Sequence, residues 1–83
     1  MNLTVKYFAS IREALGRGSE TVDTSAANLA ALRDELIARG GAYAQSLARG
    51  KAVRVALDQV MSDESAGLSD GCEVAFFPPV TGG

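Results

Sequence analysis

Histidine and tryptophan are absent from this chain of 83 residues, and cysteine occurs once, as Cys72. Without histidine the chain lacks the commonest general base and the commonest ligand of transition metals. A lone cysteine can form neither an intramolecular disulfide nor a cluster of thiolate ligands. With no histidine to activate it, we interpret Cys72 as a small apolar residue at the start of a strand rather than as a reactive thiol. The sequence therefore predicts no metal site and no bound cofactor.

An excess of basic charge and a long apolar run are missing too. Eight lysines and arginines stand against ten aspartates and glutamates, and the basic residues are spread singly along the chain. Binding to nucleic-acid phosphates needs a basic stripe, and a membrane-spanning helix needs roughly 20 apolar residues. The first residues also lack the basic segment and apolar stretch of a signal peptide. We therefore expect a cytoplasmic protein, with neither nucleic acid nor a membrane as a partner.

The composition is that of one small globular domain. Hydrophobic residues make up 47% of the chain and charged residues 22%, a balance typical of folded proteins. A chain of this length leaves no room for a second domain. We assign residues 1–77 to the folded domain and residues 78–83 to an extended C-terminal tail.

Hydrophobic periodicity predicts the elements of the first third. Residues 3–8 alternate as in a strand with one buried face. That face would carry Leu3, Val5 and Tyr7. A short helix follows over residues 10–16, with Ser10 as its N-cap. Residues 20–24 alternate around a single apolar residue, so we expect a second strand, at the edge of a sheet.

The main helix is predicted from its N-cap Asn28 to about Arg39. Its apolar stripe comprises Leu29, Leu32, Leu36 and Ile37. Arg33 lies largely off that stripe, on the polar side. We expect Glu35 and Arg39 to pair across one turn, with the positive charge near the helix C-terminus.

The second half reads as one weak helix and three strands. The weak helix covers residues 42–49, and a clear strand covers residues 53–57. A tight turn at residues 58–59 leads to a very short strand at residues 60–61. The last strand, residues 72–77, is apolar on much of both faces, which is typical of a strand in the middle of a sheet.

This order of elements predicts an α+β fold. A hairpin, a helix crossing one sheet face, and further strands give the β-grasp (ubiquitin-like) arrangement when the last strand lies centrally beside the first, in parallel. The sheet would be mixed, with one main helix packed on one face and a free C-terminal Gly-Gly tail.

The end of the chain has the most unusual sequence. It reads Phe76-Phe77-Pro78-Pro79-Val80-Thr81-Gly82-Gly83. Pro78 and Pro79 lack an N–H and fix φ, so they should stop sheet pairing and hold the chain extended. Gly82 and Gly83 give a thread thin enough for a narrow channel, and six residues extend at most about 20 Å. We interpret the α-carboxyl of Gly83 as the reactive group; the alternative is an inert terminus.

Residues 70–83 closely resemble the C-terminus of the small-subunit family of molybdopterin synthase. Residues 5–13 are similar to that family's first strand and helix, and Leu29 with residues 31–33 fits its main helix. The resemblance implies a sulfur carrier whose terminal Gly83, after Gly82, is adenylated with ATP and converted to a thiocarboxylate. That group would donate sulfur to precursor Z (cyclic pyranopterin monophosphate), building the molybdopterin dithiolene in molybdenum cofactor biosynthesis.

The resemblance also implies partners. They are a large subunit that supplies the substrate pocket of a heterotetrameric sulfurtransferase, a MoeB-type adenylyltransferase resembling ubiquitin-activating enzymes, and a sulfur donor. Residues implied to contact a partner are Phe76, Phe77, Pro78, Pro79, Val80 and Thr81. Because strand alternation sends Phe76 and Phe77 to opposite faces, we expect Phe76 in the core and Phe77 at the interface.

Two other functions fit the same chain. A β-grasp protein with a Gly-Gly end could carry sulfur for thiamine thiazole synthesis or tRNA thiolation, or be joined to lysines as a ubiquitin-like modifier. Alternatively, the domain could be a binding module with an inert tail. The residues before Gly-Gly favour molybdopterin synthesis, by resemblance.

Overall fold

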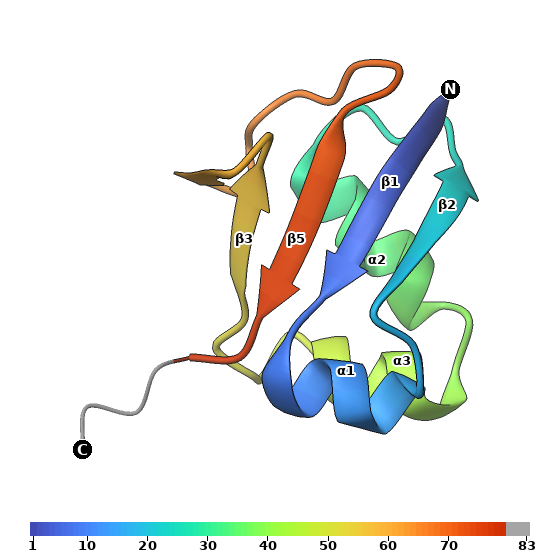
Figure 1. The fold of residues 1–83 in the computed structure, drawn as a ribbon, viewed down its shortest axis with the longest axis vertical. Coiled ribbons are helices and arrows are strands. Elements are labelled where there is room, and N and C mark those ends of the chain that lie inside the picture. Colours follow the sequence, from blue (N-terminus) through green and yellow to red (C-terminus); the bar gives the residue numbers. More distant parts are fainter. Residues whose placement is uncertain (80–83) are drawn as a thin grey trace.

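The computed structural model describes residues 1–79 of the chain (Figure 1). Its single sheet has the strand order β2-β1-β5-β3-β4. The strands are β1 (Asn2–Tyr7), β2 (Ser19–Asp23), β3 (Arg54–Leu57), β4 (Val60–Ser62) and β5 (Glu73–Phe77). The helices are α1 (Ala9–Leu15), α2 (Leu29–Ile37) and α3 (Gly41–Leu47). β5 is parallel to β1 and antiparallel to β3, so the predicted β-grasp sheet, with the last strand central and β2 at one edge, is confirmed.

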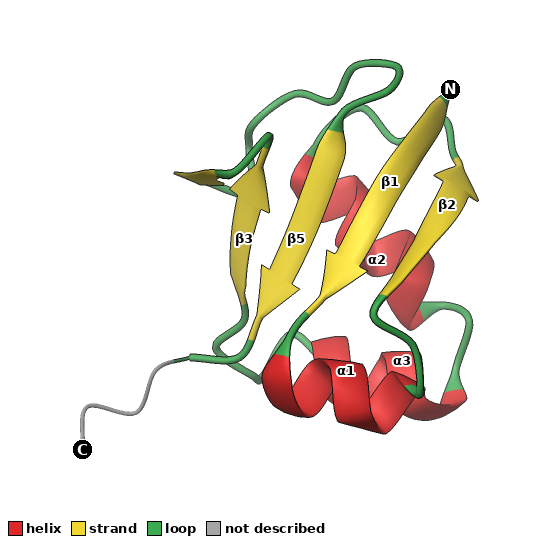
Figure 2. Cartoon of the chain, in the orientation of Figure 1, coloured by secondary structure: helices red, strands yellow, loops and turns green. Residues whose placement is uncertain are grey.

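The core lies between the sheet and the helices: α2 crosses one face of the sheet, and α1 and α3 lie at the end where β1 and β5 finish (Figure 2). Alternation in β1 puts its apolar residues on this face, and β5 contributes its own alternate residues in register. Tyr7 lies beside Phe76, and Val5 beside Val74. The largest fully buried side chains are Leu3, Val5, Tyr7, Leu29, Leu32, Leu36, Leu47, Val74 and Phe76. The predicted buried faces of the first strand and of the main helix are therefore confirmed.

The helix ends follow local chemistry. Asn28 caps α2 as predicted, because its side-chain oxygen accepts a hydrogen bond from the Ala31 amide at 2.8 Å. The predicted cap of α1 is wrong: the N-cap is Phe8, and Ser10 lies inside the helix. The expected pair between Glu35 and Arg39 is also wrong. Glu35 instead accepts a hydrogen bond from Thr24, just after β2, and Arg39 donates to Glu20 on β2 at 2.9 Å. Both partners lie across the helix–sheet contact rather than along the helix.

Arg33 was expected on the polar side of α2, but it is only 3% exposed. Its guanidinium donates to the carbonyls of Leu47 at 2.8 Å, Ala48 at 2.7 Å and Lys51 at 3.0 Å. A fourth bond, 2.7 Å long, goes to the Glu64 carboxylate. Arg33 thus bonds the Leu47 carbonyl at the end of α3 and adds a second donor to the Ala48 and Lys51 carbonyls, which also accept backbone N–H groups. It fixes the loop between α3 and β3, a role that hydrophobic periodicity could not reveal.

Glu20 on β2 joins the other end of the helix layer to the sheet. Its carboxylate accepts hydrogen bonds from Tyr7 at 2.8 Å, Tyr43 at 2.5 Å and Arg39 at 2.9 Å. Burial acts to raise the pKa of Glu20, but the bonds from Tyr43, Arg39 and Tyr7 outweigh it and hold the pKa below its usual range. Burial, with Glu20 beside it, raises the pKa of Tyr7, so the phenol remains a donor.

We predict that Arg33→Met lowers the free energy of unfolding by about 3 kcal/mol, because it removes the guanidinium donor from three carbonyls and from the Glu64 carboxylate. Arg49 is the matched control. It also binds Glu64, but its side chain is 44% exposed, so Arg49→Met should cost less than about 1 kcal/mol. Urea denaturation of both variants measures the difference. Equal losses would show that the buried position of Arg33 is irrelevant.

We predict a loss of stability in acid that depends on Glu20. Its pKa is lowered on folding, so its contribution is complete above the unfolded pKa of about 4.3 and disappears as the pH falls through the lower folded value. Glu20→Gln should therefore flatten the dependence of unfolding free energy on pH below about 4.3. Glu13→Gln, on the exposed side of α1, is the control. Parallel curves for the parent and Glu20→Gln would contradict this role.

Candidate functional site

The candidate site is the place where the chain leaves the sheet. β5 ends at Phe77, and Pro78 and Pro79 follow outside any strand, half-buried and exposed respectively. Proline has no N–H to continue a ladder, which explains this end of β5. The predicted site residues Val80, Thr81, Gly82 and Gly83 lie outside the described residues.

The two phenylalanines of β5 face opposite sides of the sheet, as expected. Phe76 is completely buried, packed parallel to the Tyr7 ring with centroids 6.2 Å apart. The prediction of Phe76 as the core member of the pair is confirmed, and its side chain has no exposed surface in the isolated chain; its contact with a partner stays a prediction. Phe77 is half-buried on the sheet face that no helix covers.

An apolar patch surrounds Phe77 on this open face. The Phe8 and Phe77 rings stack with centroids 4.6 Å apart and planes 8° apart. Phe8 is 39% exposed and Met61 54% exposed, which is unusual for such large apolar side chains. The open-face groove is lined by Phe8, Ala9, Arg54, Met61, Phe77, Pro78 and Pro79. Apolar surface thus gathers at the root of the tail.

Local backbone geometry places Phe8 in the patch. Phe8 is extended, and its amide donates to the Phe76 carbonyl at 3.2 Å. The following residue, Ala9, has φ of +50°, a left-handed conformation that non-glycine residues seldom adopt. The chain thereby turns sharply into α1 while the Phe8 ring remains over Phe77. Sequence reasoning missed Phe8 as a site residue. Side chains alternate along the strand, so Phe8 shares the open face with Lys6, two residues earlier.

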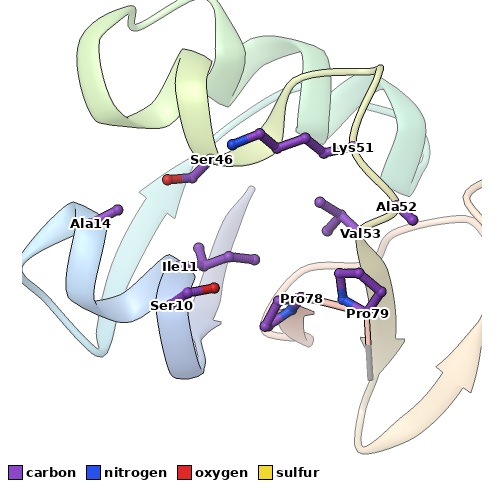
Figure 3. Close-up of a pocket in the computed structure, with 9 residues that line it drawn as sticks. All are labelled: Ser10, Ile11, Ala14, Ser46, Lys51, Ala52, Val53, Pro78 and Pro79. Atoms are coloured by element: carbon purple, nitrogen blue, oxygen red, sulfur yellow. The ribbon is translucent and has the colours of Figure 1, made fainter. Parts of the chain in front are cut away.

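A second groove lies on the helix side of the tail root (Figure 3). It has a volume of about 430 Å³ and is lined by Ser10, Ile11, Ala14, Ser46, Lys51, Ala52, Val53, Pro78 and Pro79. Figure 3 shows these side chains coming from α1, α3, the segment that leads into β3 and the two prolines after β5. The two prolines line both grooves, so they form a ridge between the open face and the helix side.

The charged groups near the ridge are basic. Arg54 lies beside Phe77 in the sheet register and lines the open-face groove, while Lys51 lines the helix-side groove. Cys72 is 4% exposed and packs in the core. Within residues 1–79 no three side chains of the metal-binding types come together. None of the helices in that range combines the length and apolar character needed to cross a bilayer.

A five-stranded mixed sheet in this order, with a central last strand from which the final residues depart, defines a ubiquitin-like β-grasp protein. The chain belongs to the ThiS family, whose model matches residues 5–83.

Two relatives match the chain over almost its whole length. It is 37% identical over 81 residues to the molybdopterin synthase sulfur carrier subunit of Haemophilus influenzae. It is 38% identical over 81 residues to the protein of that name from Escherichia coli. Each match covers 98% of this chain and 99% of the relative. The resemblance to the small-subunit family of molybdopterin synthase is therefore confirmed.

One solved structure of a complex is similar as well. It is the protein–protein complex of subunits 1 and 2 of the molybdopterin-converting factor from Helicobacter pylori. The similar chain has a TM-score of 0.69 and 26% identity, and the match covers 100% of both chains. This similarity supports the β-grasp fold over the full length.

Proposed function

We propose that this chain is the sulfur-carrier subunit of a molybdopterin synthase, with Gly83 as the residue that carries the sulfur. The observation that supports this most strongly is the match to two proteins of that name over 98% of the chain. The structure adds a rigid central strand, a Pro-Pro ridge and an apolar patch at the root of a Gly-Gly tail. These features suit a subunit that presents its terminus to a partner.

The proposed chemistry uses the main-chain terminus alone. A free α-carboxyl has a pKa of roughly 3.5, so at pH 7 it is an ionised, poor electrophile. Attack of this carboxylate on the α-phosphorus of ATP, on an adenylyltransferase, releases pyrophosphate and forms an acyl-adenylate. A sulfide donor then displaces AMP and leaves a thiocarboxylate, whose sulfur is the nucleophile toward the pterin precursor. These steps ask for no base or metal from this chain, in keeping with its lack of histidine.

The open-face patch is the proposed docking surface for the large subunit. An exposed, stacked aromatic pair with a neighbouring methionine is the composition that protein interfaces favour at their centre. Its edge carries the ion pair of Lys6 and Glu73, 3.1 Å apart, as the polar rim of an interface would. Docking here would hold the tail root against the partner, so that the residues beyond Pro79 reach the partner's pocket. The adenylyltransferase would meet the same tail in an earlier step.

We predict that, after incubation with the adenylyltransferase, ATP and a sulfide donor, intact-mass spectrometry shows one oxygen replaced by sulfur in the Gly83 peptide. The reason is that the terminal carboxyl is the only proposed acceptor. A chain lacking Gly82 and Gly83 should gain no sulfur and support no molybdopterin formation with the large subunit. Continued molybdopterin formation by that deletion variant would rule out the proposal. Transfer of sulfur to a different acceptor would instead support another carrier pathway.

We predict that Phe77→Asp weakens binding to the large subunit by roughly 30-fold or more, about 2 kcal/mol, because it puts an unpaired charge at the centre of the interface. Val60→Asp is the matched control. Val60 is 65% exposed, and its register opposite Leu57 puts it on the other face of the sheet. Isothermal titration calorimetry measures both. Similar weakening by Val60→Asp, or none by Phe77→Asp, would place the interface elsewhere.

A further inference from the structure

Basic side chains without an acidic partner gather at one end of the molecule. Five of the eight basic side chains form ion pairs with acids, namely Lys6, Arg17, Arg33, Arg39 and Arg49. The three that form no ion pair with any residue in the range 1–79 are Arg12, Lys51 and Arg54. All three are exposed, and each lines a different groove around the tail root.

These grooves adjoin one another. A loop groove of about 450 Å³ follows α1 and is lined by Ala9, Arg12, Glu13, Gly16, Arg17 and Gly18. It shares Ala9 with the open-face groove, which in turn shares the two prolines with the helix-side groove. The open-face groove, with its stacked aromatic pair, therefore lies between the other two. The three unpaired basic groups thus belong to one continuous surface with an apolar centre.

The two arginines of this surface are held in position. Arg54 lies opposite Phe77 in the register of β3 and β5, so the two side chains share the open face. Arg12 lies against Gly18, where an added Cβ would be only 3.2 Å from the Arg12 Nε atom. Glycine therefore leaves the room that the Arg12 side chain occupies. Groups positioned in this way lose less conformational freedom when a partner binds them.

The opposite end of the sheet is acidic. The Asp70 carboxylate accepts a hydrogen bond from the Asn2 amide at 2.8 Å, and the Asp58 carboxylate accepts one from the Glu73 amide at 2.9 Å. Asn2 and Glu73 begin β1 and β5, whereas the tail root lies where both strands end (Figure 1). Neither aspartate forms an ion pair with a described residue. A chain of net charge −2 thus presents unpaired positive charge on the side where its tail begins.

We propose that the large subunit binds this end of the domain with an acidic surface, whose carboxylates pair with Arg12, Arg54 and Lys51 around the apolar patch. The inference rests on the proposed function and adds the chemical character of the partner. The arginine guanidinium matches a carboxylate with two parallel hydrogen bonds. Opposite charges on two facing surfaces also steer the molecules together and raise the association rate constant.

Two other partners fit the charges less well. A nucleic-acid strand would meet only three unpaired basic groups on a chain of negative net charge, too few for the basic stripe that a phosphate backbone requires. A second copy of this chain could bring its acidic end to the basic end of the first. The measurements below distinguish that copy from the large subunit.

The test is the association rate constant with a dye-labelled large subunit, measured by stopped-flow fluorescence. For the parent chain it should fall roughly tenfold or more between about 0.01 M and about 1 M ionic strength, because the Debye length shrinks from roughly 30 Å to roughly 3 Å. At about 0.1 M, Arg12→Gln and Arg54→Gln should each lower it about threefold.

Ser69→Asp is the matched control. It makes the same change of net charge at an exposed position beside Asp70. The length of β1, roughly 20 Å, separates that position from the tail root. This is about twice the Debye length of roughly 10 Å at about 0.1 M. Ser69→Asp should therefore leave the rate constant unchanged.

A second pair of variants tests the sign of the partner's charge without removing any arginine. Ala14 is exposed and lines the helix-side groove, and lysine and glutamate are both good helix formers. Ala14→Lys should raise the association rate constant and Ala14→Glu should lower it. The two variants should differ little at about 1 M ionic strength, where the charges are screened.

Four results would overturn the proposal. Rates that do not respond to ionic strength, or that Ser69→Asp lowers as much as Arg54→Gln does, would show that the unpaired basic groups do not steer binding. Faster association of Ala14→Glu than of Ala14→Lys would indicate a basic partner. Salt-sensitive self-association of the parent chain alone would assign the basic end to a second copy. Binding that is tight but insensitive to these charges leaves the proposed function intact, whereas a large subunit that does not bind the parent chain at all would overturn both.

Discussion

Parallel pairing of β1 with β5 is the constraint on which the geometry of the site depends. It puts the last strand between two neighbours, so the backbone groups of β5 bond on both sides and its end cannot fray as an edge strand would. The same register brings Tyr7 beside Phe76 in the core and leaves Phe8 next to Phe77 on the open face. The root of the tail is thereby fixed in position and direction by the most strongly held part of the sheet.

The helix layer is secured by hydrogen-bonded charges as well as by apolar contacts. Glu20 accepts hydrogen bonds from two tyrosines and Arg39, and Arg33 donates hydrogen bonds to three carbonyls and to Glu64. Each cluster joins segments far apart in the sequence, so each acts as a cross-link in a domain too small for a large core. The Arg33 cluster also shapes the site, because the loop that it holds forms one wall of the helix-side groove.

Sequence patterns predicted the fold because strand alternation and the helical stripe both report on burial. The same patterns failed where a polar residue is buried for its hydrogen bonds, as Arg33 is, since periodicity treats every charge as a surface residue. Glu35 and Arg39 were paired by their spacing, but spacing along one helix ignores acceptors on β2. Alternation assigns Phe8 to the open face, but its stacking on Phe77 depends on where the chain turns into α1, at the left-handed Ala9, and no sequence pattern marks that turn. The sequence could locate the site at the tail. It could not identify the residues around the tail root, since they come from segments at or next to β1, β3, β4 and β5.

A carrier of this kind contributes position rather than acid–base chemistry. Under the proposed function the reacting group is the C-terminal carboxyl, so the task of the domain is to bring the root of the tail, Pro78 and Pro79, to a partner. The Pro78–Pro79 ridge directly adjoins the aromatic open face. The aromatic open face, where the Phe8 and Phe77 rings stack beside Met61, would bind a partner through apolar area. Docking there would fix the root of the tail against the partner without any side-chain chemistry from this chain.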